Sequence, residues 1–242
     1  MSSMAGSLLA VKDLHTYIAG FHILQGVSFE VEEGSVTVVL GRNGVGKTTT
    51  LKTIMGIYRP ARGEVIFRGE NIAGLPPYTI ASKGISFVPS ERNIFATLTV
   101  EENLRLAYNG PRGKLGDRLE MVYNLFPELK RFSTLKAGEL SGGQQRMLAL
   151  ACGMVREHTL LILDEPSEGL SPAYVKMFFK RLREFKKEQG KTILLVEQNF
   201  ALAREAMDFV YLMDKGVVVA GFPAEKVEEN RDLVRRILGV SL

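Results

Sequence analysis

Residues 36–48 read VTVVLGRNGVGKT, an apolar run followed by a glycine-rich loop. The run predicts a β-strand that is buried on both faces. The loop Gly41–Thr48 matches the pattern G-x-x-x-x-G-K-[ST]. After it, apolar residues recur at i, i+3, i+4 and i+7, which predicts a helix. They are Leu51, Ile54, Met55 and Tyr58. Strand, glycine loop and helix in this order are typical of a phosphate-binding site.

The residue types of this loop suit a nucleoside triphosphate. Glycines let successive backbone N–H groups curl round the β-phosphate, and the helix N-terminus adds its partial positive charge. We expect Lys47 to contact the β- and γ-phosphates, and the hydroxyl of Thr48 to bind Mg²⁺. The loop therefore predicts binding of ATP or GTP. The expected nucleotide-binding residues here are Gly41, Arg42, Asn43, Gly44, Val45, Gly46, Lys47, Thr48 and Thr49.

A second apolar run, Leu160–Leu163, ends in two carboxylates, Asp164 and Glu165. In open α/β sheets, ligands bind at the carboxyl ends of the strands. We therefore expect Asp164 to hold Mg²⁺ and Glu165 to polarise the water that attacks the terminal phosphate. A strand that simply ends in acidic residues is the alternative, and the glycine loop upstream is what favours the catalytic interpretation.

The segment Leu140–Arg146 reads LSGGQQR and opens a predicted helix that runs to about Val155. Ser141 is a good N-cap, and the glycines after it expose backbone N–H groups to an anion. A helix cap is the simpler interpretation. It does not account for a second anion-binding turn in a chain that already has one. A turn that cannot serve its own nucleotide can serve the nucleotide of a partner chain.

These three segments, in this order, resemble the ABC-type ATPases, and the resemblance covers essentially the whole chain. It implies that two such domains pack head to tail, with each ATP between the phosphate loop of one and the LSGGQ segment of the other. The residues expected to reach the partner's nucleotide are Ser141, Gly142, Gly143 and Gln144. Tyr17 matches the aromatic residue that stacks on adenine in this family; the alternative is a tyrosine packed within a strand.

Four short segments resemble more closely the ATPases of branched-chain amino acid and amide importers, the LivF-like group. They are VEQN at 196–199, SEGLSP at 167–172, FPELK at 126–130 and VRRILG at 234–239. This resemblance implies a subunit that hydrolyses ATP to power solute transport through integral membrane permease subunits. It further implies a dimer with itself or a sister ATPase, an indirect link to a solute-binding protein, and a peripheral position on the cytoplasmic face of the cell membrane.

The chain departs from the general ABC pattern at two positions. Gln198 stands where most relatives have a histidine that senses the γ-phosphate, and we expect it to be a catalytic contact that does not titrate. Ser90 stands where most relatives have glutamine and the importer group usually has glutamate. Glu91 lies one place too late to align. Ser90 is therefore a further candidate for the Mg²⁺ site, with its role open.

The whole chain predicts an α/β fold, a P-loop NTPase core of the ABC ATPase type. We expect a mainly parallel sheet, an N-terminal antiparallel β subdomain and an inserted helical subdomain. Within a single domain, 1–242, the predicted core covers 1–96 and 157–242, and the predicted helical part covers 97–156. Ser171 and Gly190 bound another predicted helix, and the tail Ala224–Leu238 predicts a charged amphipathic helix.

Composition narrows the function further. A single cysteine, Cys152, excludes an internal disulfide, and no apolar run approaches the ~18 residues that span a bilayer. The net charge is only +4, without a dense Lys/Arg block interleaved with aromatics, so nucleic acid is not an expected partner. No N-K-x-D segment supports a GTPase. A soluble ABC ATPase that acts in assembly or remodelling stays open as the alternative function.

Overall fold

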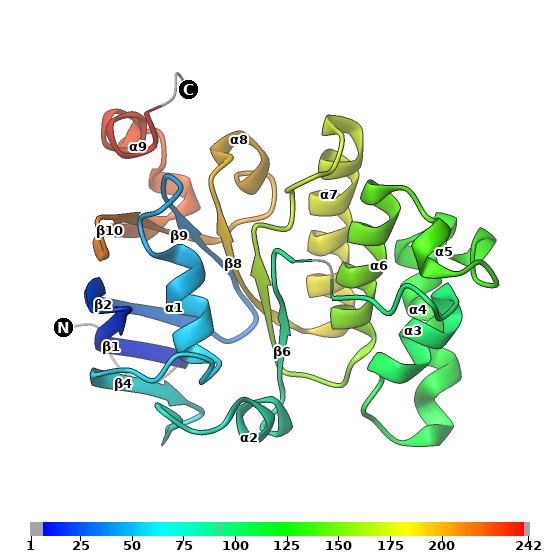
Figure 1. The fold of residues 1–242 in the computed structure, drawn as a ribbon. Helices are drawn as coiled ribbons and strands as arrows, with labels where there is room; N and C mark the ends of the chain where they lie inside the picture. The colour runs from blue at the N-terminus through cyan, green and yellow to red at the C-terminus, as the bar shows by residue number, and fades with distance from the viewer. Residues whose placement is uncertain (1–6, 92, 240–242) are drawn as a thin grey trace.

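The computed structural model describes residues 7–91 and 93–239, which form two β-sheets and the helices around them (Figure 1). The larger sheet has the strand order β10-β9-β3-β8-β7-β6, and the smaller sheet has the order β2-β1-β4-β5. The strands of the larger sheet are β3 Val36–Leu40, β6 Ile85–Val88, β7 Leu160–Asp164, β8 Thr192–Glu197, β9 Phe209–Asp214 and β10 Val217–Pro223. Those of the smaller sheet are β1 Ser7–Ile18, β2 Phe21–Glu32, β4 Arg62–Phe67 and β5 Glu70–Asn71.

The larger sheet is parallel except at β10, which runs antiparallel to β9. Strands β3, β7 and β8 are buried along their whole length, which explains why their sequences are almost continuously apolar. Because parallel strands end at the same edge, the segments that follow Leu40, Asp164 and Glu197 meet there. This edge is where the sequence places the phosphate loop and the two carboxylates.

Helix α1 (Lys47–Ile54) packs between the two sheets (Figure 1). One buried cluster joins Leu9 of the smaller sheet, Leu51 of α1 and Ile162 of the larger sheet. The smaller sheet is antiparallel throughout. Helix α1 is therefore held between β2 of the smaller sheet and β7 of the larger sheet, with the glycine-rich loop at its N-terminus.

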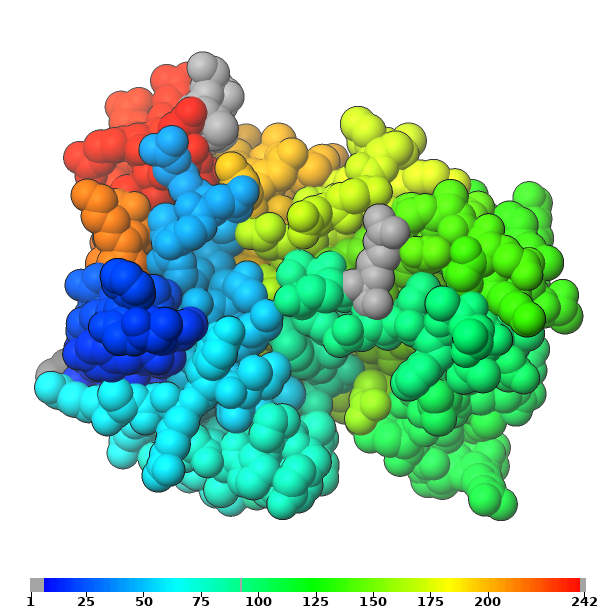
Figure 2. All heavy atoms as spheres, in the orientation of Figure 1, coloured from blue at the N-terminus to red at the C-terminus, as the bar shows by residue number. Residues whose placement is uncertain are grey.

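A group of helices follows β6 and lies on the side of the molecule opposite the smaller sheet (Figures 1 and 2). They are α3 Val100–Ala107, α4 Leu115–Leu125, α5 Pro127–Arg131 and α6 Gly142–Val155, with 3-10 turns at Arg112–Lys114 and Ala137–Glu139. Thr99 caps α3 through a reciprocal pair of bonds with Glu102. The predicted combination of a mainly parallel sheet, an antiparallel N-terminal sheet and inserted helices is confirmed.

The remaining helices are α2 Pro77–Ser82, α7 Pro172–Gln189, α8 Phe200–Ala203 and α9 Arg231–Leu238. Helix α7 buries an apolar stripe of Val175, Phe178, Phe179, Leu182 and Phe185. It ends at Gly190 in a left-handed conformation, as the sequence predicts. Ser171 is its N-cap by position, although its side chain makes no capping hydrogen bond there. No helix of the described ranges is both long and apolar enough to cross a membrane.

Two helix predictions are wrong in extent. The stripe after the phosphate loop predicts a helix that reaches Tyr58, but α1 ends at Ile54. Gly56 has φ +70°, and a Cβ at this position would lie 2.1 Å from the carbonyl oxygen of Leu75. The chain therefore turns at a site that admits only glycine.

The tail Ala224–Leu238 is likewise not one helix. A 3-10 turn at Ala224–Lys226 precedes α9, which begins only at Arg231. The side-chain amide of Asn230 donates to the carbonyl oxygen of Lys226 at 2.8 Å. Such a local side-chain bond competes with helical pairing of the backbone, so the helix starts after Asn230. Helix α9 itself is amphipathic and buries Val234 and Leu238.

Candidate active site

The phosphate loop joins the end of β3 to the start of α1. Gly44 and Gly46 have φ values of +80° and +109°, which other residues rarely adopt. Gly41 has no room for a side chain, because a Cβ would lie 2.6 Å from the carbonyl oxygen of Met213. Gly46 is also the N-cap of α1, so the free N–H groups of the first helical turn face the loop. The glycines are therefore required for the backbone conformation of the loop. The N-terminus of α1 provides N–H groups that can bind an anion.

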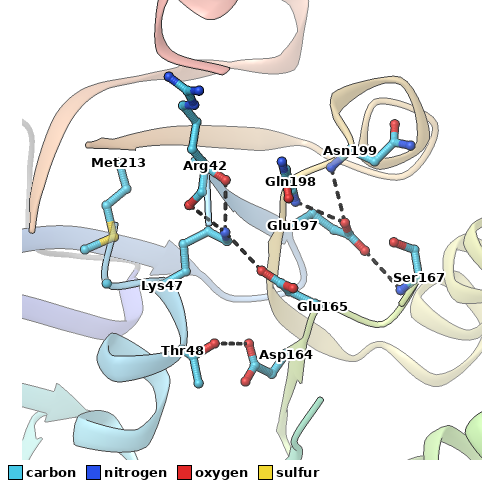
Figure 3. Close-up of polar contacts among 12 residues, drawn as sticks. Arg42, Lys47, Thr48, Asp164, Glu165, Ser167, Glu197, Gln198, Asn199 and Met213 are labelled. Atoms are coloured by element: carbon cyan, nitrogen blue, oxygen red, sulfur yellow. Dashed lines mark hydrogen bonds and ion pairs between the residues drawn. The ribbon is translucent and has the colours of Figure 1, made fainter. Parts of the chain in front are cut away.

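Lys47 is held at the centre of the site (Figure 3). Its side chain is 3% exposed, and Nζ donates to the carbonyl oxygens of Gly41 at 2.9 Å and Arg42 at 3.1 Å. Nζ also forms an ion pair with Oε1 of Glu165 at 3.0 Å. The ammonium is thus aimed from α1 toward the end of β7, and a phosphate would compete with Glu165 for it.

Thr48 and Asp164 form the next contact along the same edge. Oγ1 of Thr48 donates to Oδ1 of Asp164 at 2.9 Å. Asp164 is fully buried, and burial raises the pKa of its carboxyl group, against the opposing effect of the bond from Thr48. Among the residues that the structure describes, Oδ2 of Asp164 has no hydrogen-bond partner. A buried carboxylate oxygen of this kind, beside a hydroxyl, suits a hard cation such as Mg²⁺.

Glu165 stands between two clefts. The smaller, of about 370 Å³, is lined by phosphate-loop residues and by the β1–β2 turn. Its lining residues are Ile18, Ala19, Phe21, Ile23, Gly44, Gly46, Lys47, Thr48, Thr49 and Glu165. The larger, of about 860 Å³, brings Glu165 together with Asn43 and Gln198. The structure therefore gathers the predicted catalytic pair, Glu165 and Gln198, with the predicted phosphate ligands.

Glu197 fixes the backbone that carries Gln198. Its carboxylate is 2% exposed, and Oε2 accepts hydrogen bonds from the backbone N–H groups of Gln198 at 3.1 Å and Asn199 at 3.4 Å. Oε1 accepts from the N–H of Ser167 at 3.0 Å. Burial raises the pKa of Glu197, and these N–H groups oppose that effect. One carboxylate thus ties the loop after β8 to the loop after β7 (Figure 3). Sequence reasoning missed Glu197, whose only signal was an acidic residue at the end of an apolar strand.

Tyr17, near the end of β1, is not among the residues that line the smaller cleft. Its ring stacks on His22, with 4.3 Å between ring centroids and 6° between ring planes, and it is 53% exposed. The aromatic residue of the cleft lining is Phe21, which is 72% exposed. The sequence pointed to Tyr17 alone. The only sequence signal for Phe21 was an aromatic residue directly after Gly20.

Ser141 and its neighbours lie apart from both clefts. Oε1 of Gln144 accepts from the backbone N–H of Ser141 at 2.9 Å, and Oγ of Ser141 accepts from the N–H of Gln144 at 3.4 Å. The predicted N-cap is confirmed, and the pair is a full capping box. Gly142 and Gly143 follow as the first residues of α6. The segment is thus an ordered helix N-terminus whose residues line neither cleft of its own chain.

Ser90 contacts the rest of the site through its backbone. Its carbonyl oxygen accepts from Nη1 of Arg146 at 3.1 Å. The neighbouring Glu91 forms an ion pair with Lys52 of α1 at 3.0 Å. The hydrogen bond from Lys52 lowers the pKa of Glu91, and the same bond raises the pKa of Lys52. The acidic residue of this loop is therefore engaged with α1.

Comparison with known proteins agrees with this geometry. The family model described as ABC transporter matches residues 24–168, more than half of the chain. This chain belongs to the ABC transporter family. This ABC ATPase is 40% identical to the probable branched-chain amino acid transport ATP-binding protein LivF of Archaeoglobus fulgidus, over 90% of this chain and 93% of that protein. It is an ATP-binding subunit that hydrolyses ATP.

Two further likenesses cover most of this ABC ATPase. The high-affinity branched-chain amino acid transport ATP-binding protein BraG of Pseudomonas aeruginosa is 37% identical over 88% of this chain and 91% of that protein. A solved ATP-binding subunit of an ABC transporter superposes with a TM-score of 0.81 at 30% identity, covering 97% of this chain and 96% of that one. The likeness therefore extends over both sheets and the helices around them.

Proposed function

We propose that this ABC ATPase powers the import of a branched-chain amino acid or a related amide through integral membrane permease subunits. The extended likeness to two branched-chain amino acid transport proteins carries this proposal. The subunit would be peripheral, on the cytoplasmic face of the membrane, and a solute-binding protein would act only indirectly. ATP hydrolysis would supply the energy for transport, and the proximity of Lys47, Thr48, Asp164 and Glu165 at one sheet edge supports this part of the proposal.

The working unit in this proposal is a dimer, with itself or with a sister ATPase. Each nucleotide would lie between Gly41–Thr49 of one chain and Ser141–Gln144 of the other. The position of the capped α6 N-terminus outside both clefts of its own chain supports this sharing. Helix N-termini bind anions through free N–H groups and the helix dipole. Tyr17 remains the proposed adenine contact, because its ring is exposed beside the β1–β2 turn that lines the smaller cleft.

Thr48 and Asp164 are the proposed Mg²⁺ ligands. The described residues contain no group of three or more His, Cys, Asp or Glu side chains that could hold a metal by themselves. The cation would therefore depend on oxygens of the nucleotide as well as on this pair. When bound, Mg²⁺ neutralises negative charge on the phosphates. Ser90 remains a further candidate ligand, although its known contact is through the backbone.

The ion pair between Lys47 and Glu165 means that the nucleotide must bind before Glu165 can act on water. A terminal phosphate that takes the Lys47 ammonium removes it from Oε1 of Glu165. The carboxylate is then available to accept a hydrogen bond from water and to polarise it for attack. Gln198 lines the larger cleft together with Glu165, and its side-chain amide can donate to the phosphate oxygens. Binding of the nucleotide thereby prepares the group that hydrolyses it.

Co-purification tests the transport assignment. The tagged chain is expressed in its native cell, the membranes are solubilised in mild detergent, and the bound proteins are identified by mass spectrometry. Integral membrane permease subunits are expected, and uptake of labelled leucine, isoleucine and valine is expected to fall when the gene for this chain is deleted. Capture of soluble partners alone, with unchanged uptake, would instead favour an ATPase that acts in assembly or remodelling.

A further inference from the structure

Glu165 has a backbone conformation that residues other than glycine rarely adopt. Its φ is +44°, in the left-handed region. Its N–H donates to the carbonyl oxygen of Val196 at 3.1 Å, and its own carbonyl oxygen accepts from the N–H of Glu168 at 3.1 Å. Unfavourable conformations of this kind persist only when surrounding groups hold them, and they gather at active sites. The groups that hold the backbone of Glu165 therefore help to determine the direction of its carboxylate.

Arg146 of α6 holds both peptide groups that flank Glu165. Its side chain is 2% exposed, and Nη2 donates to the carbonyl oxygens of Asp164 at 2.8 Å and Glu165 at 2.9 Å. The first carbonyl belongs to the peptide before the Glu165 Cα, and the second belongs to the peptide after it. Hydrogen bonds from a charged donor are about twice as strong as neutral ones. Arg146 therefore restrains the two torsions that define this residue.

The guanidinium is itself fixed from the other side. Nη1 of Arg146 donates to the carbonyl oxygens of Pro89 at 2.6 Å and Ser90 at 3.1 Å, in the loop after β6. Four carbonyls from two segments thus surround one planar group. A lysine carries a single ammonium on a flexible chain and cannot present this planar fork. The arrangement depends on arginine and not merely on a positive charge.

We infer that Arg146 is a positioning residue for ATP hydrolysis, which holds Glu165 in its left-handed conformation and so directs its carboxylate to Lys47 and to the attacking water. The inference rests on the proposed role of Glu165. Helix α6 would then have two roles. Ser141 at its N-terminus would contact the partner's nucleotide, and Arg146, little more than one turn later, would position Glu165. Arg146 is the last residue of the LSGGQQR segment, and the sequence alone predicts no role for it.

The test compares Arg146→Lys with Arg118→Lys. Arg118 is a matched control because it is 8% exposed and binds the other end of α6, donating to the carbonyl oxygens of Met154, Val155 and Arg156. We expect Arg146→Lys to lower kcat by about tenfold or more, because small displacements of a reacting group are costly. The Kd for ATP and the melting temperature should change no more than in Arg118→Lys. Equal kcat in the two variants would overturn the inference.

A double-mutant cycle separates an action through Glu165 from a general loss of structure. If Arg146 acts by aiming the Glu165 carboxylate, Arg146→Lys should have little further effect on single-turnover hydrolysis once Glu165→Gln is present. Independent effects that multiply would overturn the inference, even if both single variants are slow. A Glu165→Gln variant that hydrolyses ATP at the parental rate would instead refute the proposed role of Glu165 itself. The two failures are therefore distinguishable.

Discussion

At the scale of single residues, the Lys47 ammonium can pair either with the Glu165 carboxylate or with a phosphate. The ammonium is held by Glu165 and by two loop carbonyls, and it is almost fully buried. A buried ammonium requires such partners, because leaving it unpaired would be costly. A phosphate can replace the carboxylate without exposing the charge to an apolar environment. The Lys47 ammonium is therefore already positioned among acceptors, and an anion can take the place of one of them.

Gln198 gives the first prediction at this scale. Gln198→Ala should lower the rate of ATP hydrolysis by about tenfold or more, since a donor to the developing charge is lost. Gln198→His should restore much of the rate and add a pH-dependent limb near neutrality, because histidine titrates at about pH 6.5 and glutamine does not. The terminal phosphate of ATP also titrates there, so the difference between the pH profiles of the parent and Gln198→His is the measurement. Parental activity in Gln198→Ala, with superimposable profiles, would remove Gln198 from the site.

His158 gives a prediction about stability. It is 5% exposed, and burial, followed by the nearby charge of Lys191, lowers its pKa to about 3. The unfolded chain binds a proton at this side chain as the pH falls through about 6.5, whereas the folded chain does not until about 3. The folded state therefore loses up to about 1.4 kcal/mol of stability per pH unit from this group as the pH falls between these values.

His158→Gln should flatten that decline. Urea unfolding of the parent and the variant at several pH values between 6.5 and 4.5 measures the free energy of unfolding directly. Phe185→Leu, at the buried ring beside His158, is the control: it alters packing but removes no titratable group, so it should keep the parental slope. Equal slopes for the parent and His158→Gln would show that His158 does not contribute to the acid sensitivity.

At the scale of elements, the sequence predicts what is local. The strand 36–40, the glycine-rich turn before α1 and the capped helices after Thr99 and Ser141 follow from adjacent residues, and the structure confirms them. The premature end of α1 could not be predicted, because Gly56 is required by the carbonyl group of Leu75, which lies 19 positions away. Arg146 and Glu197 were missed for the same reason. Their partners come from loops that only the folded sheet brings together.

The α6 N-terminus supplies the prediction at this scale. Ser141→Arg should abolish hydrolysis, because a long cationic side chain would block the turn that serves the opposite nucleotide. Binding of ATP by Lys47 of the same chain should stay nearly intact. Fluorescent-nucleotide titration and a phosphate-release assay measure the two quantities separately. Equal loss of binding and hydrolysis would mean that Ser141 is only a local helix cap, in which case Ser141→Ala would weaken the protein by about 1 kcal/mol.

At the scale of the whole molecule, the proposed dimer couples ATP hydrolysis to separation of the two chains, because each ATP lies between them. Glu165→Gln keeps the size of the side chain and leaves Thr48 and Asp164 untouched, but it weakens the polarising group. It should bind ATP, hydrolyse it slowly and accumulate as an ATP-loaded dimer, alone or with its sister subunit. Light scattering with and without ATP measures the mass. Lys47→Ala, which lacks the phosphate contact, is the control and should remain monomeric in ATP. A Glu165→Gln variant that binds ATP but stays monomeric both alone and with the sister subunit would contradict the dimer.

The order of the larger sheet also shapes how the chain is made. Strand β3 pairs with β8 and β9, so Val36 lies opposite Ile193 and Thr37 lies opposite Phe209. On the ribosome, a nascent chain would complete its phosphate loop long before either hydrogen-bonding neighbour of β3 had been synthesised. Such distant pairing slows folding and leaves an apolar strand unprotected during translation. Competence to bind ATP should therefore arrive late and abruptly, once the segment around residue 209 has left the exit tunnel.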